Sequence, residues 1–394
     1  MRITPSRLAP ALALGAGLAL LAGCAPGATP GSSGTTGATT VSPASLTTDP
    51  AEMGDVTLVV WDQEVRGGQN DEIEALNAAF HAQYPNITID RHAQSFDDLQ
   101  KTGRLALTGP DAPDVIEANN TRSQMGTFVQ AGQLLALDSY AAAYGWTTRY
   151  PATVLALSSY SADGKTFGSG QLYGLPQIGE VVGFYYNKAK LAALGLTVPA
   201  TWADLEAALA TAKQAGETPV MLGDLDKWPA VHVFGVIQGA HVAPAEIHNL
   251  VMGNAGADWT DQANVAAATE LQDWVNKGYF NSDVLGSDDS TFGSRFATGE
   301  GVFYLGGSWY APELAAGQQA QFGFFAPPPA QAGAGSATTG GTSLPFAITA
   351  ASAHPDAAAA YIDFLNSTDA MTVIADKGNL PVINAAALAP ASGT

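Results

Sequence analysis

The strongest constraint on the fold is a repeated alternation of short apolar runs with amphipathic helical segments. Residues 56–61 (VTLVVW) are β-branched and apolar, which is typical of a buried strand, and a helical stripe runs from Ile73 to Phe80. The same order recurs with a strand-like run at 87–89 and a helix expected over 97–108. Strands that alternate with helices predict parallel βαβ units and therefore an α/β fold.

The alternation continues through the rest of the chain. Thr201, followed three residues later by Asp204, predicts a capped helix start. The remaining strands are expected at 114–116, 181–186, 219–222, 301–305, 321–326 and 345–349, and the remaining helices at 122–131, 229–239, 262–277, 290–299 and 354–367.

The N-terminal segment has the layout of a secretory signal. An apolar run from Leu8 to Leu21 follows Arg2 and Arg7, and it is too short for a comfortable membrane span. The run ends at Cys24, the only cysteine, and residues 21–24 (LAGC) resemble the bacterial lipobox. We therefore predict a signal peptide over 1–23 and lipidation of Cys24, which would hold the exported protein on the outer face of the cytoplasmic membrane, or on the cell surface of a Gram-positive organism.

The segment after the cysteine has a composition typical of a linker. Residues from 25 to about 50 are almost wholly Ala, Gly, Ser, Thr and Pro, which cannot bury enough surface to offset the entropy of ordering. We predict a flexible tether over 24–54. About 370 residues remain after the signal peptide, more than one compact core usually holds, so two domains are expected.

Charge and cysteine usage exclude several classes of function. The net charge of −20 argues against nucleic-acid binding, which depends on Lys and Arg facing phosphates, and against binding anionic lipid by charge. With no second cysteine, the chain can form no internal disulfide and no cysteine-ligated metal site.

Catalytic signatures are missing from the sequence. We find no nucleophile elbow, zinc-protease motif, phosphate loop or dinucleotide glycine fingerprint. Asp288 and Asp289 are adjacent and are expected to cap the helix at 290–299. We predict no enzyme, no cofactor and no metal, although paired catalytic carboxylates meet in space rather than in sequence, so a secreted glycoside-processing enzyme stays open as an alternative.

Three polar loops follow predicted strands, and ligands of open α/β sheets bind beyond the carboxyl ends of strands. The loops are residues 62–66, residues 117–122 and residues 306–310, and the last contains two aromatic side chains. Aromatic faces and polar hydroxyl partners together suit sugars. The candidate ligand residues in these loops are Gln63, Glu64, Arg66, Asn119, Asn120, Arg122, Trp309 and Tyr310.

Strings spread over nearly the whole mature chain are similar to the extracellular solute-binding proteins of carbohydrate ABC transporters, the family typified by maltodextrin-binding protein. Each string is weak alone, but they occur in the family's order behind a lipobox. They are residues 80–87 (FHAQYPNI), 109–116 (GPDAPDVI), 131–138 (AGQLLALD), 173–176 (YGLP) with 185–188 (YYNK), 199–205 (PATWADL), 306–309 (GGSW) and 340–342 (GGT).

The resemblance implies a periplasmic-binding-protein type II-like fold, in which two α/β lobes are joined by a hinge and enclose a ligand cleft. The first lobe would comprise residues 55–178 plus 346–394 and the second lobe residues 179–345. The implied partners are a sugar, an oligosaccharide by expectation, and the transmembrane subunits of an ABC permease, with the receptor acting as a monomer. The family continues beyond the Gly378–Pro381 region with further helices of the second lobe, so a truncated sequence or a short variant is expected here.

The resemblance also implies roles for individual residues. Arg66 and Arg122 match positions that present sugar-hydroxyl partners, and Glu180 matches a cleft carboxylate at the first crossing between the lobes. Trp309 matches a stacking tryptophan. The other implied contacts are Trp228, in a segment that often adds an aromatic, and Gly341 and Thr342 at the second crossing.

One departure limits the implied substrate. Ala118 stands where the maltodextrin binders carry a tryptophan, so a stacking platform is missing and maltodextrin itself is in doubt. The alternatives to a sugar are another solute bound by the same fold, such as a polyol or an amino compound, and a cell-surface scaffold without a ligand. The identity of the sugar and of the permease does not follow from the sequence.

Overall fold

The computed structural model describes residues 38–318, 321–335 and 337–384. The predicted signal peptide over 1–23, the predicted lipidation site Cys24 and residues 385–394 lie outside this part of the chain. Within the described ranges, no helix combines the length and the apolar character needed to cross a membrane.

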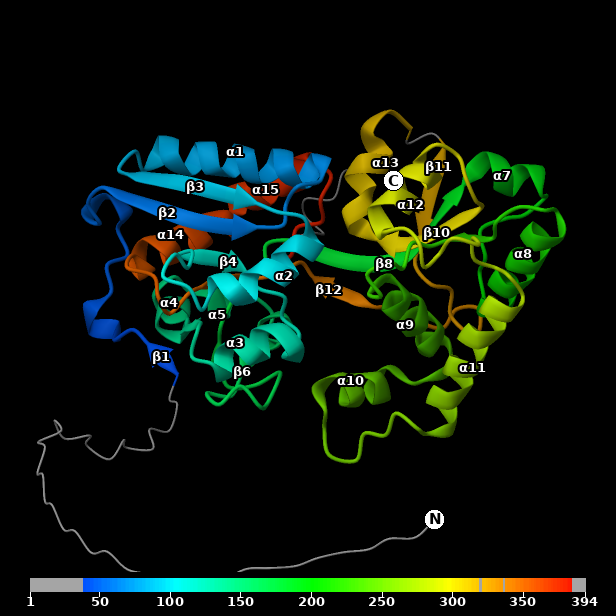
Figure 1. Ribbon diagram of the computed structural model, residues 1–394, viewed down its shortest axis with the longest axis horizontal. Coiled ribbons are helices and arrows are strands. Elements are labelled where there is room, and N and C mark those ends of the chain that lie inside the picture. The colour runs from blue at the N-terminus through cyan, green and yellow to red at the C-terminus, as the bar shows by residue number, and fades with distance from the viewer. Residues whose placement is uncertain (1–37, 319–320, 336, 385–394) are drawn as a thin grey trace, which may run out of the picture. The chain divides into compact units, whose positions relative to one another are not determined.

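The first sheet has the strand order β13-β4-β2-β3 (Figure 1). Its central strand β2 (Val56–Asp62) runs parallel to β3 (Ile87–Ala93) and β4 (Val115–Glu117), which confirms the predicted parallel βαβ units here. Strand β13 (Phe346–Ile348) pairs antiparallel with β4, because it returns from the second sheet rather than from a neighbouring βαβ unit.

Helices pack against this sheet through their apolar stripes. The predicted stripe of α1 (Gly67–Gln83) buries Ile73, Leu76 and Phe80, and Figure 1 shows the helix running along β3. The other elements around the sheet are α2 (Phe96–Ala106), η3 (Arg122–Gly126), α3 (Thr127–Gln130), β5 (Leu135–Ala136), α4 (Asp138–Ala143), α5 (Trp146–Arg149), α6 (Ala152–Ala156), β6 (Ser159–Tyr160), β7 (Gln171–Leu172), α14 (Pro355–Leu365) and α15 (Thr368–Asp376).

The second sheet has the order β11-β8-β10-β9. The long strand β8 (Gly179–Asn187) pairs antiparallel with β10 (Phe303–Gly307) and β11 (Phe322–Phe325), and β10 runs parallel to β9 (Val220–Met221). This sheet is therefore mixed rather than parallel throughout. The surrounding elements are α7 (Lys188–Ala193), α8 (Trp202–Gln214), α9 (Pro229–His241), α10 (Pro244–Met252), α11 (Gln262–Asn276), α12 (Asp289–Ala297), η4 (Ser308–Tyr310) and α13 (Ala311–Gln318).

Each sheet has its own hydrophobic core, and we call the two parts lobe 1 and lobe 2. The main core of lobe 1 contains buried residues from 56–178 and again from 346–383, whereas the core of lobe 2 contains residues from 182–322. The chain passes between them at the start of β8, where Gly179–Val181 also pairs with β12 (Gly340–Thr342). Two α/β lobes joined at paired strands agree with the predicted fold class.

The predicted tether over 24–54 is wrong for its described end. Strand β1 (Thr39–Thr40) pairs with β5, and Val41, Leu46 and Met53 pack against the core of lobe 1. The Thr47 amide also donates to the Asp356 carboxylate at 3.0 Å. A few apolar side chains are sufficient to hold a segment of small residues against a hydrophobic core, because their burial removes apolar surface from water.

Two predicted helix starts are confirmed by their caps. Thr201 and Asp204 form the complete capping box of α8, with each side chain accepting from the other's backbone amide at 3.2 and 3.0 Å. Asp288 caps α12 by accepting from the Thr291 amide at 2.7 Å. Its neighbour Asp289, by contrast, turns inward and is buried.

Candidate functional site

The site is built where lobe 1 and lobe 2 touch, which we call the junction. Arg66, after β2, places its guanidinium 5.1 Å from the centre of the Tyr310 ring in η4. Phe96, at the start of α2, contacts the indole of Trp228, with ring centres 5.5 Å apart. These contacts bring together the strand-end loops of both sheets, as parallel-strand topology favours.

Two further contacts cross the junction. Asp97, beside Phe96, faces Asp226 of lobe 2, and burial together with the charge of this second carboxylate raises the pKa of Asp97. Arg122 donates to the Val251 carbonyl in the last turn of α10 at 3.0 Å. The lobes are therefore in contact at several separate points.

Aromatic rings line the lobe 2 side of the junction. The ring centres of Trp309 and Trp228 lie 6.2 Å apart. The imidazole centre of His232 in α9 lies 5.6 Å from that of Trp309 and 5.8 Å from that of Trp228. Burial lowers the pKa of His232 to about 4, so this imidazole is neutral at physiological pH. The Nε1 of Trp309 is buried without a hydrogen-bond partner, which leaves a donor available to a ligand.

Gly307 is what allows the Trp309 ring to lie where it does. A Cβ added at Gly307 would stand 2.0 Å from the Trp309 ring. Only glycine lets the backbone of β10 pass this close beneath an indole. The absence of a side chain at Gly307 in the Gly-Gly-Ser-Trp string thus leaves room for the Trp309 ring.

Carboxyl groups crowd the junction, two of them from lobe 1 and one from the start of β8. Glu64 and Glu117 are fully buried, and Gln63 donates to both: its backbone amide donates to Glu117 at 2.7 Å and its side-chain amide to Glu64 at 3.3 Å. Burial raises the pKa of Glu64 to about 7 and that of Glu117 well above its usual range. Glu180, at the start of β8, is half-buried, and burial together with the Glu64 charge raises its pKa to about 8.

Alongside Arg91, Arg66 is a cation close to these acids. It interacts electrostatically with Glu64 and Glu180 and, across the junction, with Asp289 and Glu313. Asp289 is held by the hydroxyl groups of Tyr304 and Tyr310, which donate at 2.8 and 2.7 Å. Burial raises the pKa of Asp289 to about 6, against the effect of these two hydrogen bonds. Among the described residues, no group of three His, Cys, Asp or Glu side chains is arranged to hold a metal ion.

The structure places the predicted ligand residues in two groups. The first group meets at the junction and consists of Gln63, Glu64, Arg66, Glu180, Trp228, Trp309 and Tyr310. Tyr310 is fully buried, its ring lies against the Arg66 guanidinium and its hydroxyl donates to Asp289. It therefore positions other residues of the site and is not itself open to a ligand.

The second group lies on residues 119–122 and on β12, and its member Arg122 also contacts lobe 2 across the junction. The Asn119 side chain accepts from the Thr121 amide at 3.2 Å and so stabilises its own turn, while the Asn120 carbonyl accepts from the Tyr160 hydroxyl. Arg122 is exposed, and its guanidinium donates to the Val251 carbonyl of lobe 2. Gly341 is exposed and Thr342 half-buried on β12, and the Thr342 hydroxyl is buried without a partner.

Several junction residues were missed from the sequence. Phe96 follows the carboxyl end of β3, so the strand-end rule would have found it had the strand been extended beyond residue 89. Asp289 was predicted only to cap a helix, and His232 carries no sequence signal because a histidine in an apolar helix is usually a packing residue. Gln69, in the first turn of α1, is buried with both amide atoms unpartnered, which no pattern in the sequence indicates.

The fold and this junction define a two-lobed α/β binding protein of the periplasmic type II class. Residues 67–372 match the family described as bacterial extracellular solute-binding protein, and the chain belongs to that family. A curated relative, the multiple sugar-binding protein of Streptococcus mutans, is 27% identical over 217 residues, covering 54% of this chain and 51% of the relative. The chain matches about half the length of its curated relatives.

Solved structures share the fold. A structure described under xylan utilization by Caldanaerobius polysaccharolyticus has a TM-score of 0.71 at 23% identity, covering 83% of this chain and 82% of its own. The GacH receptor of Streptomyces glaucescens, solved unliganded and with acarbose, has a TM-score of 0.68 at 21% identity, covering 85% and 82%. At these identities the likeness extends to the fold alone.

Proposed function

We propose that the protein is the lipid-anchored receptor of an ABC importer and captures a sugar, an oligosaccharide in particular, at the junction of its lobes. The observation that carries the proposal is the junction itself, where the ring centres of Trp228 and Trp309 lie 6.2 Å apart and two buried polar atoms, Trp309 Nε1 and Glu64 Oε2, have no hydrogen-bond partner. Ring faces suit the C–H surface of a sugar, and unpartnered donors and acceptors suit its hydroxyl groups.

In the proposed division, lobe 1 comprises 55–178 plus 346–394 and lobe 2 comprises 179–345. The lobes close on the ligand by hinge motion, and the closed surface is what the transmembrane subunits of the permease recognise. Cys24 carries the lipid, the protein acts as a monomer, and it performs no chemistry on the sugar. The family membership and the sugar-binding relative support this proposal.

A ligand with an amino group is the second candidate. The carboxyl groups of Glu64, Glu117 and Glu180 outnumber the two cations near them, Arg66 and Arg91, and ammonium groups are favoured beside such carboxyls. Protonated carboxyl groups, however, also donate to and accept from sugar hydroxyls. Binding of cationic amines in place of neutral sugars would favour this second candidate.

The experiment that tests the proposal is a thermal melt of the protein against mono- and oligosaccharides, polyols and polyamines. A ligand present at 100 times its Kd adds about 2.7 kcal/mol to the free energy of unfolding. For a body of this size that raises the Tm by roughly 2–4 °C per kcal/mol. We expect a shift with one class of sugar. A cooperative melt that no sugar moves, or product release from an oligosaccharide, would overturn the proposal.

A further inference from the structure

Residues 38–54, which we call the strap, lie outside the four-stranded sheet of lobe 1 and pack against that lobe. The strap contains β1 and two short 3₁₀ helices, η1 (Pro43–Ser45) and η2 (Pro50–Glu52). Strand β1 pairs in parallel with β5, and η1 contacts α4 (Figure 1). The strap therefore begins on the part of lobe 1 formed by β5 and α4, which we call the β5–α4 face.

Lobe 1 side chains bind the strap backbone near both of its ends. The Ser139 hydroxyl of α4 donates to the Val41 carbonyl at 2.8 Å. At the other end, the Asn86 side-chain amide donates to the carbonyls of Pro50 and Gly54, at 2.9 and 2.8 Å. Hydrogen bonds at both ends fix the strap along its length on lobe 1.

The middle of the strap is also held by lobe 1. The half-buried side chains of Val41, Leu46 and Met53 pack against the lobe 1 core. Between the last two, the Thr47 amide donates to the Asp356 carboxylate of α14 at 3.0 Å. Burial of apolar surface and a charge-assisted hydrogen bond both stabilise the docked strap.

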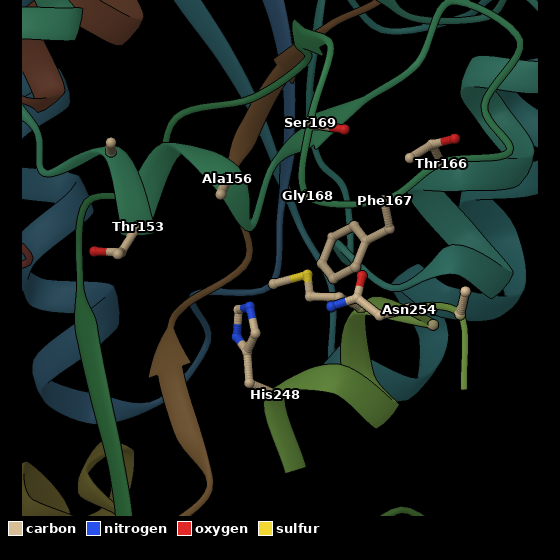
Figure 2. A pocket seen from close by; sticks show the side chains of 12 residues that line it. Thr153, Ala156, Thr166, Phe167, Gly168, Ser169, His248 and Asn254 are labelled. Atoms are coloured by element: carbon tan, nitrogen blue, oxygen red, sulfur yellow. The ribbon is translucent and has the colours of Figure 1, made fainter. Parts of the chain in front are cut away.

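All of these contacts are with lobe 1. Among the described residues, no strap residue lines the cavity between the lobes, where Figure 2 shows Phe167 of lobe 1 and His248 of lobe 2 directed into one space. The docked strap thus leaves the space between the lobes free, and a force applied through it acts on lobe 1.

The strap shortens the chain by which a lipid at Cys24 can hold the protein. A chain spans at most about 3.3–3.6 Å per residue, whatever its conformation. The 14 residues from 25 to 38 therefore reach at most about 50 Å, whereas the 31 residues from 25 to 55 would reach about 110 Å if the strap were free. Docking thus halves the maximal reach and makes β1 the point of attachment.

This shorter reach restricts orientation. A compact body of about 350 residues has a radius of gyration of about 20 Å and hence a diameter of about 50 Å. The path around half of such a body is about 80 Å long, which exceeds the reach of about 50 Å. The side opposite the point of attachment therefore cannot turn to the membrane while the strap is docked.

We propose that the strap turns the β5–α4 face of lobe 1 toward the membrane and makes lobe 1 the anchored lobe of the receptor. The inference rests on the proposed function, because it requires the lipid at Cys24. It adds an orientation on the membrane, which the proposed function leaves open.

The test is fluorescence energy transfer from the full lipidated chain to phosphatidylcholine vesicles that carry an acceptor dye on the lipid headgroup. Cys24 is the only cysteine and its thiol is used by the lipid, so a cysteine introduced elsewhere is the sole site for a donor dye. Ala142→Cys in α4 and Gln214→Cys in α8 report on the two lobes, because both positions are exposed. We expect stronger transfer from position 142 than from position 214.

Two matched variants test whether the strap causes this difference. Val41→Asp combined with Leu46→Asp places charges where the strap packs against the core, and should abolish the difference between the two donors. Ser42→Asp combined with Ala44→Asp adds the same charge at exposed positions of the same segment and should preserve it. Both pairs change the strap alone, so the fully buried residues of the two cores are unaltered.

Hydrogen exchange provides a measurement that needs no variant. The Thr47 amide of the unaltered chain should exchange more slowly than in the unfolded chain, because it is hydrogen-bonded to Asp356. Free exchange of this amide, or equal transfer from both donors on the vesicles, would overturn the inference and leave the proposed function standing. A difference that persists in the Val41→Asp, Leu46→Asp variant while its Thr47 amide exchanges freely would also overturn it. A chain that does not associate with the vesicles would refute the lipid anchor of the proposed function, and the inference with it.

Discussion

At the scale of single residues, Trp309 combines packing with an unused donor. It is 8% exposed and belongs to the core of lobe 2, yet its Nε1 has no partner among the described residues. A buried donor without a partner costs free energy that a bound ligand can recover. Core packing and ligand contact are therefore compatible roles for this one side chain.

We predict that Trp309→Phe weakens sugar binding about tenfold while keeping most of the core volume. The lost indole N–H removes one hydrogen bond of about 1–1.5 kcal/mol. Titration calorimetry measures the effect, with Trp259→Phe as the control because Trp259 is 55% exposed. Unchanged affinity in Trp309→Phe would reduce Trp309 to a packing residue.

The raised pKa values at the junction predict how stability depends on pH. Burial raises the pKa of Glu180 to about 8 and that of Glu64 to about 7, from the ordinary value of about 4.5 that applies when the chain is unfolded. Between these limits the folded state binds more protons, so their stabilising contribution is complete below about pH 4.5 and is lost as the pH rises through 7 to 8.

We expect the free energy of unfolding of the ligand-free protein to fall between pH 5 and pH 8, by at most about 1.4 kcal/mol per pH unit for each group. Urea titrations at several pH values measure the slope. Glu180→Gln should flatten it, because the amide cannot ionise. A slope that is as steep in Glu180→Gln as in the parent would exclude Glu180 as a source.

At the scale of elements, helix caps contribute to stability, whereas the loops at strand ends form the candidate ligand site. The capping box of α8 begins the helix, and Trp202 in its first turn stacks on Trp274 with ring centres 5.8 Å apart. This element lies away from the junction contacts described above. It should therefore influence stability and leave ligand binding unchanged.

Thr201→Ala is expected to lower the free energy of unfolding by about 1 kcal/mol, because the Asp204 amide loses its acceptor. Thr211→Ala, in the same helix but away from the cap, should be neutral or slightly stabilising. Urea denaturation of both variants makes the comparison. Equal effects of the two substitutions would mean that the cap contributes nothing here.

At the scale of the whole molecule, several contacts join the two lobes across the junction. Arg122 was predicted to bind ligand, yet its Nη2 atom donates to the Val251 carbonyl of lobe 2. An arginine at a helix C-terminus also interacts favourably with the helix dipole. We infer that Arg122 holds the lobes together, whether or not it also meets the sugar.

We predict that Arg122→Ala shifts the ligand-free protein toward an open arrangement and weakens sugar binding several-fold through faster dissociation. Loss of a contact between the lobes changes the ligand-free protein, whereas loss of a ligand contact leaves the ligand-free protein unchanged. Small-angle X-ray scattering of the ligand-free variant should give a larger radius of gyration than the parent. An unchanged radius with weakened binding would leave Arg122 as a ligand contact alone.

Much of the fold was predictable because it follows from local periodicity. The strands at β2, β3 and β8, the helices α9, α11 and α14 and the capping box of α8 each lie close to the predicted residues. The two-lobed class followed from strings that resemble the family, which the match over residues 67–372 confirms. Order of elements along the chain is a local property, and hydrophobic patterns record it directly.

The sequence alone thus determined the alternating elements, the family and the polar loops from which a site could be built. Only the tertiary structure decided which of those loops meet, that Asp289 turns inward, that residues 39–53 dock on lobe 1 and that Arg122 reaches across to α10. The physical reason is that burial, pKa and unpartnered polar atoms depend on neighbours far apart in the chain. Glu64 and Glu117, for example, are 53 positions apart and interact electrostatically only because β2 and β4 are adjacent strands.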